Sequence, residues 1–390
     1  MDSRENIDLG QKFQQEYERL EKEIKKPNIL IAGATGAGKS SIINMVFGEE
    51  VAQTGTGKPV TQNIQVYESE HSSVRIFDSK GYELGDSADK EFFNTVIALA
   101  KESNNPENSI HMIWYCIAES GSRVTDYDLS ALQTFHQAGL PVAVLFTKAD
   151  ISNDETALAM KAMLPEWAQK SLFEVSTRSS KYNHIEELVE WSIEQLPISL
   201  RDAFIKTQKI NLKEKWKKAH GIIAQHVGTS FAVGFVPIPM SDAPLLVTNE
   251  LSLLARVLFY YDLGSIKQSL TTMGASSILG PLLTSAGRSL AASIFKALPG
   301  VGTFVGGLIS GAVGASITYA LGEAASTISY GISKAQLNGD NIKVQNLMKN
   351  FGPLVVEKAE DFLKRKKKSS EDYTFEEADS DDIKTRNNHD

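Results

Sequence analysis

The sequence predicts an α/β domain followed by an all-α domain. In the first half of the chain, short apolar runs alternate with segments of helical periodicity, which is typical of a mostly parallel sheet with helices on both faces. Beyond residue 197, strand patterns give way to long helical stretches. One apolar run, Ile29 to Ala32, leads directly into a glycine-rich segment and then a helical one. This strand–loop–helix order places the first candidate site at the end of a buried strand.

Composition limits the fold and the class of protein. With 390 residues, of which 42% are hydrophobic and 23% charged, the chain can bury a sizeable core and is expected to form two domains. A net charge of −8 argues against a general nucleic-acid binder. Cys116 has no partner for a disulfide, and the polar N-terminal MDSRENIDLG does not resemble a secretory signal. We therefore expect a cytoplasmic protein with no nucleic-acid partner.

The glycine-rich segment follows the P-loop spacing, G-x-x-x-x-G-K-S. Glycines allow successive backbone N–H groups to curl around a polyphosphate at close range. Lys39 is expected to reach the β and γ phosphates, and the Ser40 hydroxyl to hold Mg²⁺. The alternative is a glycine-rich turn that only joins a strand to a helix. The residues expected to surround the phosphates are Gly33, Ala34, Thr35, Gly36, Ala37, Gly38, Lys39, Ser40 and Ser41.

An amphipathic helix is expected ahead of this strand, over residues 5 to 25. Its apolar residues recur at helical spacing, with charged residues elsewhere on the turn. This helix could pack on the nucleotide domain, pack on the C-terminal region, or bind a partner. The apolar residues are Leu9, Phe13, Tyr17, Leu20 and Ile24.

Two further motifs are expected to contact the γ-phosphate and the metal. The threonine-rich loop VAQTGTGKPVTQNIQVYE precedes a strand at Ile64 to Tyr67, and Thr61 is our choice to bind Mg²⁺ and release it after hydrolysis. Thr54 and Thr56 are the alternatives. A strand at Val74 to Phe77 ends in Asp78-Ser79-Lys80-Gly81. Asp78 can hold Mg²⁺ through water, and the backbone N–H of Gly81 can donate to the γ-phosphate.

The base site is expected after two later strands. Apolar strands over 109 to 118 and over Val142 to Phe146 flank a helical segment at 125 to 137, and the second strand ends in Thr147-Lys148-Ala149-Asp150. A carboxylate at Asp150 can accept from guanine N1–H and the exocyclic amine, which adenine cannot supply. Lys148 can lie along the base. The strand Leu172 to Val175 leads to Ser176 and Thr177, whose backbone N–H groups could meet the guanine carbonyl. The alternative is an ordinary loop with solvated charges.

Taken together, GATGAGKSSIIN, PVTQNIQVYE, IFDSKGYE, IWYCIAESGSRVTDYD and VLFTKAD resemble the TRAFAC-class GTPases, most closely the Era-like, septin-like and immunity-related branches. The resemblance covers residues 27 to 197. It implies a six-stranded Ras-like sheet and hydrolysis of GTP to GDP with Mg²⁺, with Lys39, Thr61 and Gly81 as catalytic residues.

The sequence departs from this family pattern at two positions. Thr147 stands where many members have Asn, so some loop-to-loop hydrogen bonding is expected to be lost. Tyr82 stands where Ras-type enzymes place the water-orienting Gln, which implies slow turnover. Lys80 and Arg123 are candidates for charge stabilisation, or else solvated loop residues. The alternatives are a nucleotide-gated binding module with negligible turnover, or a P-loop ATPase in which Asp150 is incidental.

The C-terminal half is expected to be helical. A Lys-rich segment at 206 to 218 is followed by a helix near 241 to 263 with Asp242 at its start, and then by two helical runs around a turn at Pro299 to Gly302. The motifs PIPMSDA, KALPGVG and ITYALGEA resemble a YcjF-like domain of unknown function found fused to bacterial GTPases. Small residues recur every fourth position within 297 to 322 and allow another helix to approach closely, either in lipid or inside a soluble bundle.

The expected organisation is an N-terminal helix (1–26), a GTP-binding domain (27–197), a helical domain (198–368) and an acidic, disordered tail (369–390). A helix at 341 to 363 is followed by the basic run Lys364 to Lys368, which either complements the helix dipole or attracts anionic lipid heads. The expected partners are guanine nucleotide, a second copy across the nucleotide face, and a membrane surface, peripherally or by insertion of the hairpin.

Overall fold

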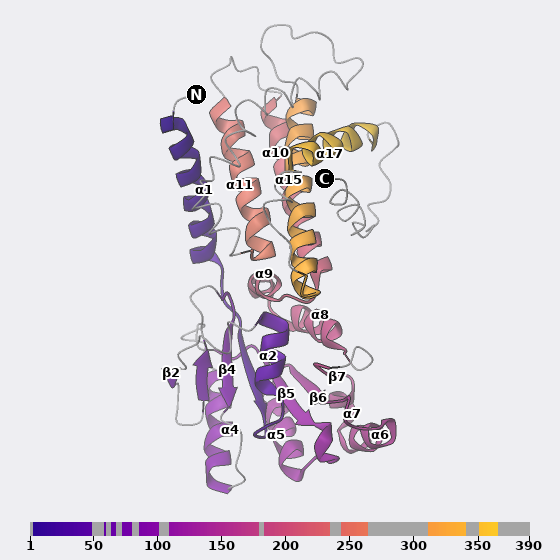
Figure 1. Ribbon diagram of the computed structural model, residues 1–390. Helices are drawn as coiled ribbons and strands as arrows, with labels where there is room; N and C mark the ends of the chain where they lie inside the picture. The colour runs from indigo at the N-terminus through magenta and orange to yellow at the C-terminus, as the bar shows by residue number, and fades with distance from the viewer. Residues whose placement is uncertain are drawn as a thin grey trace. The chain divides into compact units, whose positions relative to one another are not determined.

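The computed structural model divides the chain into two compact units, Ile24–Asn211 and a helical unit that combines Met1–Glu23 with Leu212–Asp390 (Figure 1). Within them it describes residues 3–48, 58–59, 64–67, 72–79, 86–100, 109–178, 183–234, 243–263, 311–340 and 351–365. Of the residues singled out in the sequence, those that lie outside the described residues are Thr54, Thr56, Thr61, Lys80, Gly81, Tyr82, Asp242, the 297–310 half of the hairpin with its Pro299–Gly302 turn, residues 341–350, Lys366–Lys368 and the tail.

The Ile24–Asn211 unit is built on a sheet with the strand order β2-β3-β4-β1-β5-β6-β7. The strands from β4 to β7 pair in parallel, whereas β2 and β3 are antiparallel. This confirms the predicted α/β class, with seven strands in place of six because a two-residue edge strand, β2, is added. The strands are β1 (Asn28–Gly33), β2 (Lys58–Pro59), β3 (Ile64–Tyr67), β4 (Arg75–Ser79), β5 (Met112–Ala118), β6 (Val142–Thr147) and β7 (Leu172–Val175).

Helices cover both faces of this sheet. Alternate residues of β1 enter two separate cores: Ile29 and Ile31 lie in one, and Leu30 in the other. The first core also receives side chains of α2, α8 and α9, and the second receives side chains of α4 and α5. A strand buried on both faces explains the continuous apolar run. The helices are α2 (Lys39–Phe47), α4 (Asp86–Ala100), η1 (Glu119–Gly121), α5 (Asp126–Gln137), α6 (Asp154–Met163), α7 (Glu166–Gln169), α8 (Ile185–Gln195) and α9 (Ile198–Thr207).

Helix α9 belongs to this unit, although the sequence placed the domain end at residue 197. Phe204 meets Phe47 and Trp114 edge-on, with ring centroids 5.8 Å and 6.3 Å apart, while Phe47 and Trp114 stack on each other. Trp114 Nε1 also donates to Ser192 Oγ at 3.1 Å. Burial of such aromatic groups stabilises the unit strongly. The α/β core therefore extends to Asn211.

The helical unit contains five described helices: α1 (Ser3–Glu23), α10 (Leu212–Gly234), α11 (Ala243–Tyr261), α15 (Gly311–Leu337) and α17 (Phe351–Arg365). Helices α10, α11 and α15 pack on one another, α1 lies on α11, and α17 lies on α15. The apolar face of α1 enters this core, because Tyr17 meets Phe259 edge-on at 5.4 Å. On α17, Phe362 contacts Tyr319 at 4.7 Å. Of the alternatives left open for the N-terminal helix, packing on the C-terminal region is observed.

Helix α15 contains the second half of the glycine-rich hairpin, and its small residues face α10. A Cβ on Gly314 would lie 3.5 Å from the carbonyl oxygen of Ser230, and a Cβ on Gly322 only 2.6 Å from Cγ1 of Ile223. The small residues therefore allow close helix approach inside a bundle of this chain. In the described part of the chain, no helix combines the length and the apolar character needed to cross a membrane.

A chain of hydrogen bonds joins three helices inside this bundle. Thr318 Oγ1 donates to the Gly314 carbonyl at 3.0 Å, so it accepts from Ser230 Oγ at 2.7 Å. Ser230 Oγ accepts from Asn249 Nδ2 at 2.8 Å, and Asn249 Oδ1 lies 2.8 Å from His226 Nδ1. Burial lowers the pKa of His226, which favours the neutral ring, and because Asn249 Oδ1 is an acceptor, this ring donates from Nδ1. One donor direction thus runs from His226 on α10 to Asn249 on α11, returns to Ser230 on α10, and continues to Thr318 on α15.

Replacing Gly322 with Ala should destabilise the chain. The added Cβ would meet a β-branched side chain that has little rotamer freedom, and overpacking costs about 1–3 kcal/mol, against about 1 kcal/mol gained in helix propensity. Gly228→Ala on α10 is the matched control, because no described atom lies within 4 Å of its Cβ position, and it should stabilise by about 0.5–1 kcal/mol. Urea unfolding of both variants measures the difference, and equal stabilisation by both would contradict the close packing of α10 and α15.

Candidate functional site

The candidate site lies where the parallel strands end. Strands β1, β4, β6 and β7 end at Gly33, Ser79, Thr147 and Val175. Because parallel strands share one carboxyl edge, the loops that follow them meet there. Four of the motifs singled out in the sequence are therefore brought to the same edge of one sheet.

The P-loop connects β1 to α2 as predicted. Gly33, Gly36 and Gly38 have φ values of 137°, 75° and 87°, a region that side chains with a Cβ rarely adopt. At Gly33 space is limiting as well, since a Cβ would lie 2.2 Å from the carbonyl oxygen of Cys116 on β5. Gly33 is therefore required by both the backbone conformation and the neighbouring strand.

Lys39 is the first residue of α2, and its side chain folds back over the loop. Its ammonium donates to the carbonyl oxygens of Gly33 at 2.9 Å and Ala34 at 3.1 Å, and the residue is buried. The backbone N–H groups that begin a helix also favour an anion. A buried cation and a helix N-terminus thus occupy one loop, which can bind a phosphate group.

Asp78 gives a test of whether the site suits a divalent cation. Its Oδ1 is buried and has no hydrogen-bond partner among the described residues, and burial raises the pKa of this carboxyl to about 6, although Lys39 opposes the shift. A cation or its water would supply the missing partner. Ser40 lies exposed on the first turn of α2. Both residues fit the predicted Mg²⁺ site, whereas Thr61 and Gly81 lie outside the described residues.

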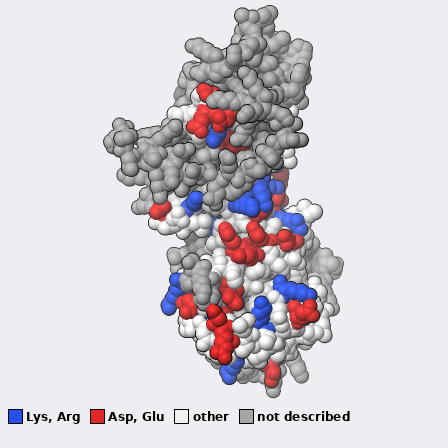
Figure 2. All heavy atoms as spheres, turned by 90° about the vertical axis from the view of Figure 1, so that its right-hand side faces the viewer, with Lys and Arg blue, Asp and Glu red and all other residues white. Residues whose placement is uncertain are grey.

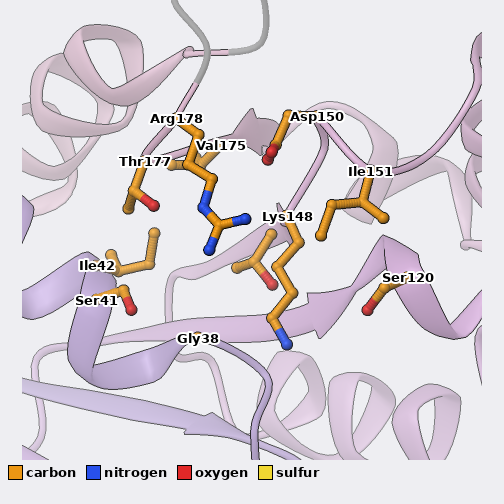
Figure 3. Close-up of a pocket in the computed structure, with 11 residues that line it drawn as sticks. Gly38, Ser41, Ile42, Ser120, Lys148, Asp150, Ile151, Val175, Thr177 and Arg178 are labelled. Carbon is orange, nitrogen blue, oxygen red and sulfur yellow. The ribbon is translucent and has the colours of Figure 1, made fainter.

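A cavity of about 320 Å³ opens beside the P-loop (Figure 3). Its walls come from the start of α2, from the loop after β5, and from the loops that follow β6 and β7. The predicted phosphate and base residues thus line the same space. The lining residues are Gly38, Ser41, Ile42, Ser120, Thr147, Lys148, Asp150, Ile151, Val175, Thr177 and Arg178.

The Asp150 side chain is oriented by Ser176, a residue that was expected to contact the base through its backbone N–H. The hydroxyl of Ser176 donates to Asp150 Oδ1 at 2.6 Å, so this side chain holds the carboxylate at the cavity. A hydrogen bond to a charged acceptor is stronger than one between neutral groups. Thr177 lines the cavity as expected. The sequence placed Ser176 in the site but did not reveal this contact.

Thr147 keeps a connection between the base loop and the P-loop. Its hydroxyl donates to the carbonyl oxygen of Ala37 at 2.7 Å. One hydrogen bond between these loops is therefore kept without Asn, while the loss of others stays a prediction. Lys148, the next residue, has a φ of 56°, an uncommon conformation for a residue with a side chain. Its side chain extends into the cavity (Figure 3).

Five lining residues were not anticipated from the sequence: Ile42, Ser120, Ile151, Val175 and Arg178. Ile42 and Ile151 supply apolar surface next to predicted motifs. Arg178 lies two residues after Ser176, and its side chain turns into the cavity (Figure 3). Its position directly after Ser176 and Thr177, the last predicted motif, was the signal in the sequence that could have placed Arg178 in the site.

Comparisons with known proteins find similarity over part of the chain. A family model described as 50S ribosome-binding GTPase matches residues 28–148. The probable GTP-binding protein EngB of Mesomycoplasma hyopneumoniae (strain 232) is 20% identical over 166 residues, which cover 42% of this chain and 82% of that protein. Cell division control protein 10 of Saccharomyces cerevisiae is 22% identical over 157 residues, which cover 33% of this chain and 48% of that protein.

Among solved structures, the crystal structure of a probable GTP-binding protein engB covers 43% of this chain and 97% of its own, with 18% identity and a TM-score of 0.32. The family match lies entirely within the Ile24–Asn211 unit.

Replacing Thr147 with Val should weaken the link between the two loops. The substitution keeps the shape but removes the donor to Ala37, and a hydrogen bond of this kind contributes about 0.5–1.5 kcal/mol to the free energy of unfolding. Thr134→Val is the control, because the Thr134 hydroxyl donates to the Ser130 carbonyl on the surface of α5. Urea unfolding should show a clear loss for Thr147→Val only. Equal effects of the two substitutions would argue against the bridge.

Proposed function

We propose that the Ile24–Asn211 unit, in which residues 28–148 match a GTPase family model, binds GTP with Mg²⁺ through the residues of this site and hydrolyses it slowly. We further propose that the nucleotide state controls association of the helical unit. One observation carries the proposal for the site: Gly38 and Ser41 of the P-loop segment line the same cavity as Asp150. A phosphate-binding loop and a carboxylate suited to guanine thus open into one space.

Guanine is selected by hydrogen-bond donors. The Asp150 carboxylate accepts from guanine N1–H and the exocyclic amine, whereas adenine offers no N1–H. Ser176 fixes one oxygen of this carboxylate at 2.6 Å, so its orientation is set before the base arrives. Lys148 covers part of the base with its alkyl chain.

The phosphates are held by the P-loop. The Lys39 ammonium already has two carbonyl acceptors, and on binding it exchanges them for oxygens of the β and γ phosphates. Ser40, Asp78 and Thr61 would hold Mg²⁺, which supplies positive charge to the phosphates when bound. The Gly81 backbone N–H is assigned to the γ-phosphate. Hydrolysis therefore depends on the positioning of the phosphates and on neutralisation of their negative charge.

Turnover is expected to be slow. Tyr82 provides no carboxamide to orient the attacking water, and even Ras-type enzymes with that Gln turn over intrinsically at only about 10⁻⁴ per second. A second copy of the chain could supply the missing group across the nucleotide face. If turnover is negligible, the alternative function applies, and the chain acts as a nucleotide-gated binding module.

The helical unit is proposed to respond to the nucleotide by association with a second copy. The small residues of α15 are already used against α10, which argues against insertion of this half of the hairpin into lipid. The YcjF-like resemblance of this region supplies an architecture and no partner. On the face shown in Figure 2, basic and acidic side chains intermingle over the described atoms.

Replacing Asp150 with Ala should remove guanine selectivity. Hydrogen bonds to a charged group contribute about 1.5–3 kcal/mol each, so the loss of two should weaken GTP binding by about a hundredfold or more, with little change for ATP. Asp150→Asn should shift preference toward XTP, because an amide donor suits the C2 carbonyl of xanthine. Calorimetry measures these affinities. Equal affinity of the unmutated chain for GTP and ATP would end the proposal for guanine.

Association should depend on the bound nucleotide. Light scattering after size exclusion should show a larger particle with a non-hydrolysable GTP analogue and Mg²⁺ than with GDP. Lys39→Ala, which lacks the phosphate-binding ammonium, should show no such difference. Flotation with anionic liposomes distinguishes the membrane alternative. A particle size that is independent of nucleotide, with flotation only in the GTP state, would replace self-assembly with membrane binding.

A further inference from the structure

His226 on α10 is a buried histidine whose two ring nitrogens face groups of opposite character. Nδ1 lies 2.8 Å from Asn249 Oδ1, and Nε2 lies 3.4 Å from Nη1 of Arg256. Asn249 and Arg256 both belong to α11, so one ring contacts two turns of the neighbouring helix. A guanidinium offers N–H donors and no acceptor, so the nitrogen that faces Arg256 can take part in a hydrogen bond only as the acceptor.

The neighbours of Asn249 fix the direction of its amide. Nδ2 lies 3.4 Å from the carbonyl oxygen of His226 and 2.8 Å from Ser230 Oγ. A carbonyl oxygen accepts and never donates, so the amide nitrogen lies at this end and the amide oxygen faces the ring. The Ser230 hydroxyl passes its own hydrogen to Thr318, and the Thr318 hydroxyl donates to the Gly314 carbonyl. The network is therefore complete when the ring carries a hydrogen on Nδ1 and none on Nε2.

The surroundings of the ring oppose a second proton. Burial lowers the pKa of His226, and the charge of Arg256 on α11 lowers it further, while Glu16 on α1 acts in the opposite direction. From α15, the hydroxyl of Thr318 joins the network through Ser230. The other histidine of α10, His220, lies elsewhere on this helix and has its own partner, Glu323 of α15, 2.8 Å from Nε2.

We propose that this network is a pH-sensitive latch, which holds α10 against α11 and α15 while the His226 ring is neutral and opens when the ring binds a second proton. That proton would lie on Nε2, directly against the Arg256 guanidinium, so one of the two groups has to move. If the ring turns away, Asn249 Oδ1 loses its donor and the link from α11 to Ser230 is no longer held in place. The latch lies within the helical unit and does not depend on nucleotide, so it goes beyond the function proposed above.

The direction of the pH dependence follows from the lowered pKa. A histidine in an opened or unfolded segment has a pKa of about 6.5, so below this pH the opened state binds a proton that the closed network refuses. The stability of the latch is fully present above this pH. It is lost as the pH falls from this value through the lower pKa of the closed state. One proton changes the opening equilibrium by up to about tenfold per pH unit in this window.

Hydrogen exchange measured by mass spectrometry on the full chain tests the latch, because it resolves the opening of individual helices. The unmutated chain is compared with His226→Gln between about pH 7.5 and 5, after correction for intrinsic exchange. Glutamine keeps one donor and one acceptor but does not titrate. Peptides from α10 and α11 should open more on acidification in the unmutated chain than in His226→Gln, by up to about tenfold per pH unit. His136→Gln, on the exposed surface of α5, is the control and should behave like the unmutated chain.

A second variant tests the role of the cation. Arg256→Gln removes the charge that faces Nε2 and can offer an amide oxygen to it, so this variant should open less on acidification than the unmutated chain does. The same pH dependence in the unmutated chain and in His226→Gln, or a steeper one in Arg256→Gln, would overturn the proposal.

If His226→Gln does not fold, nitrogen-15 NMR of the unmutated chain decides. A neutral His226 ring with its hydrogen on Nδ1 at about pH 7.5 supports the latch. A ring that is doubly protonated at that pH, or that carries its single hydrogen on Nε2, overturns it.

Discussion

The site depends on the close parallel pairing of β1 with β5. Gly33 lies so near β5 that a Cβ would meet the Cys116 carbonyl at 2.2 Å, and this contact sets where the P-loop leaves the sheet. Parallel pairing from β4 to β7 then brings the other loops to the same edge. The contacts that complete the site join these loops: Thr147 to Ala37, and Ser176 to Asp150. Both contacts depend on the strands ending at the same edge of the sheet.

The parts of this arrangement that follow from local chemistry were predictable from the sequence. The glycine spacing of the P-loop requires a particular backbone, and an apolar run bounded by such residues is a buried strand in almost any context. Strands β3 and β7 begin and end where the sequence predicted. The predicted P-loop and base residues Gly38, Ser41, Thr147, Lys148, Asp150 and Thr177 line one cavity.

The parts that depend on side-chain direction and on distant packing were not predictable in this way. No local signal shows that Ser176 uses its hydroxyl, or that the single hydrogen of Thr147 goes to Ala37. The place of α9 was missed for the same reason. Phe204 is distant in sequence from Phe47 and Trp114, and only the folded chain brings the three rings together. In the helical unit, the small residues of α15 indicated that another helix approaches closely. They serve this purpose both in lipid and inside a soluble bundle, so the sequence did not show which of the two applies.

One unit is continuous in the sequence, whereas the other is formed from two separate segments. Helix α1 packs on α11, yet the complete Ile24–Asn211 unit lies between them in the sequence. The Ile24–Asn211 unit is therefore an insertion in the sequence of the helical unit. During synthesis α1 leaves the ribosome first, and α11 begins only at Ala243. At about 5–20 residues per second, the apolar side chains of Phe13 and Tyr17 wait on the order of ten seconds or longer for their partner. The inserted domain can fold in that interval, so the order of translation separates the folding of the two units.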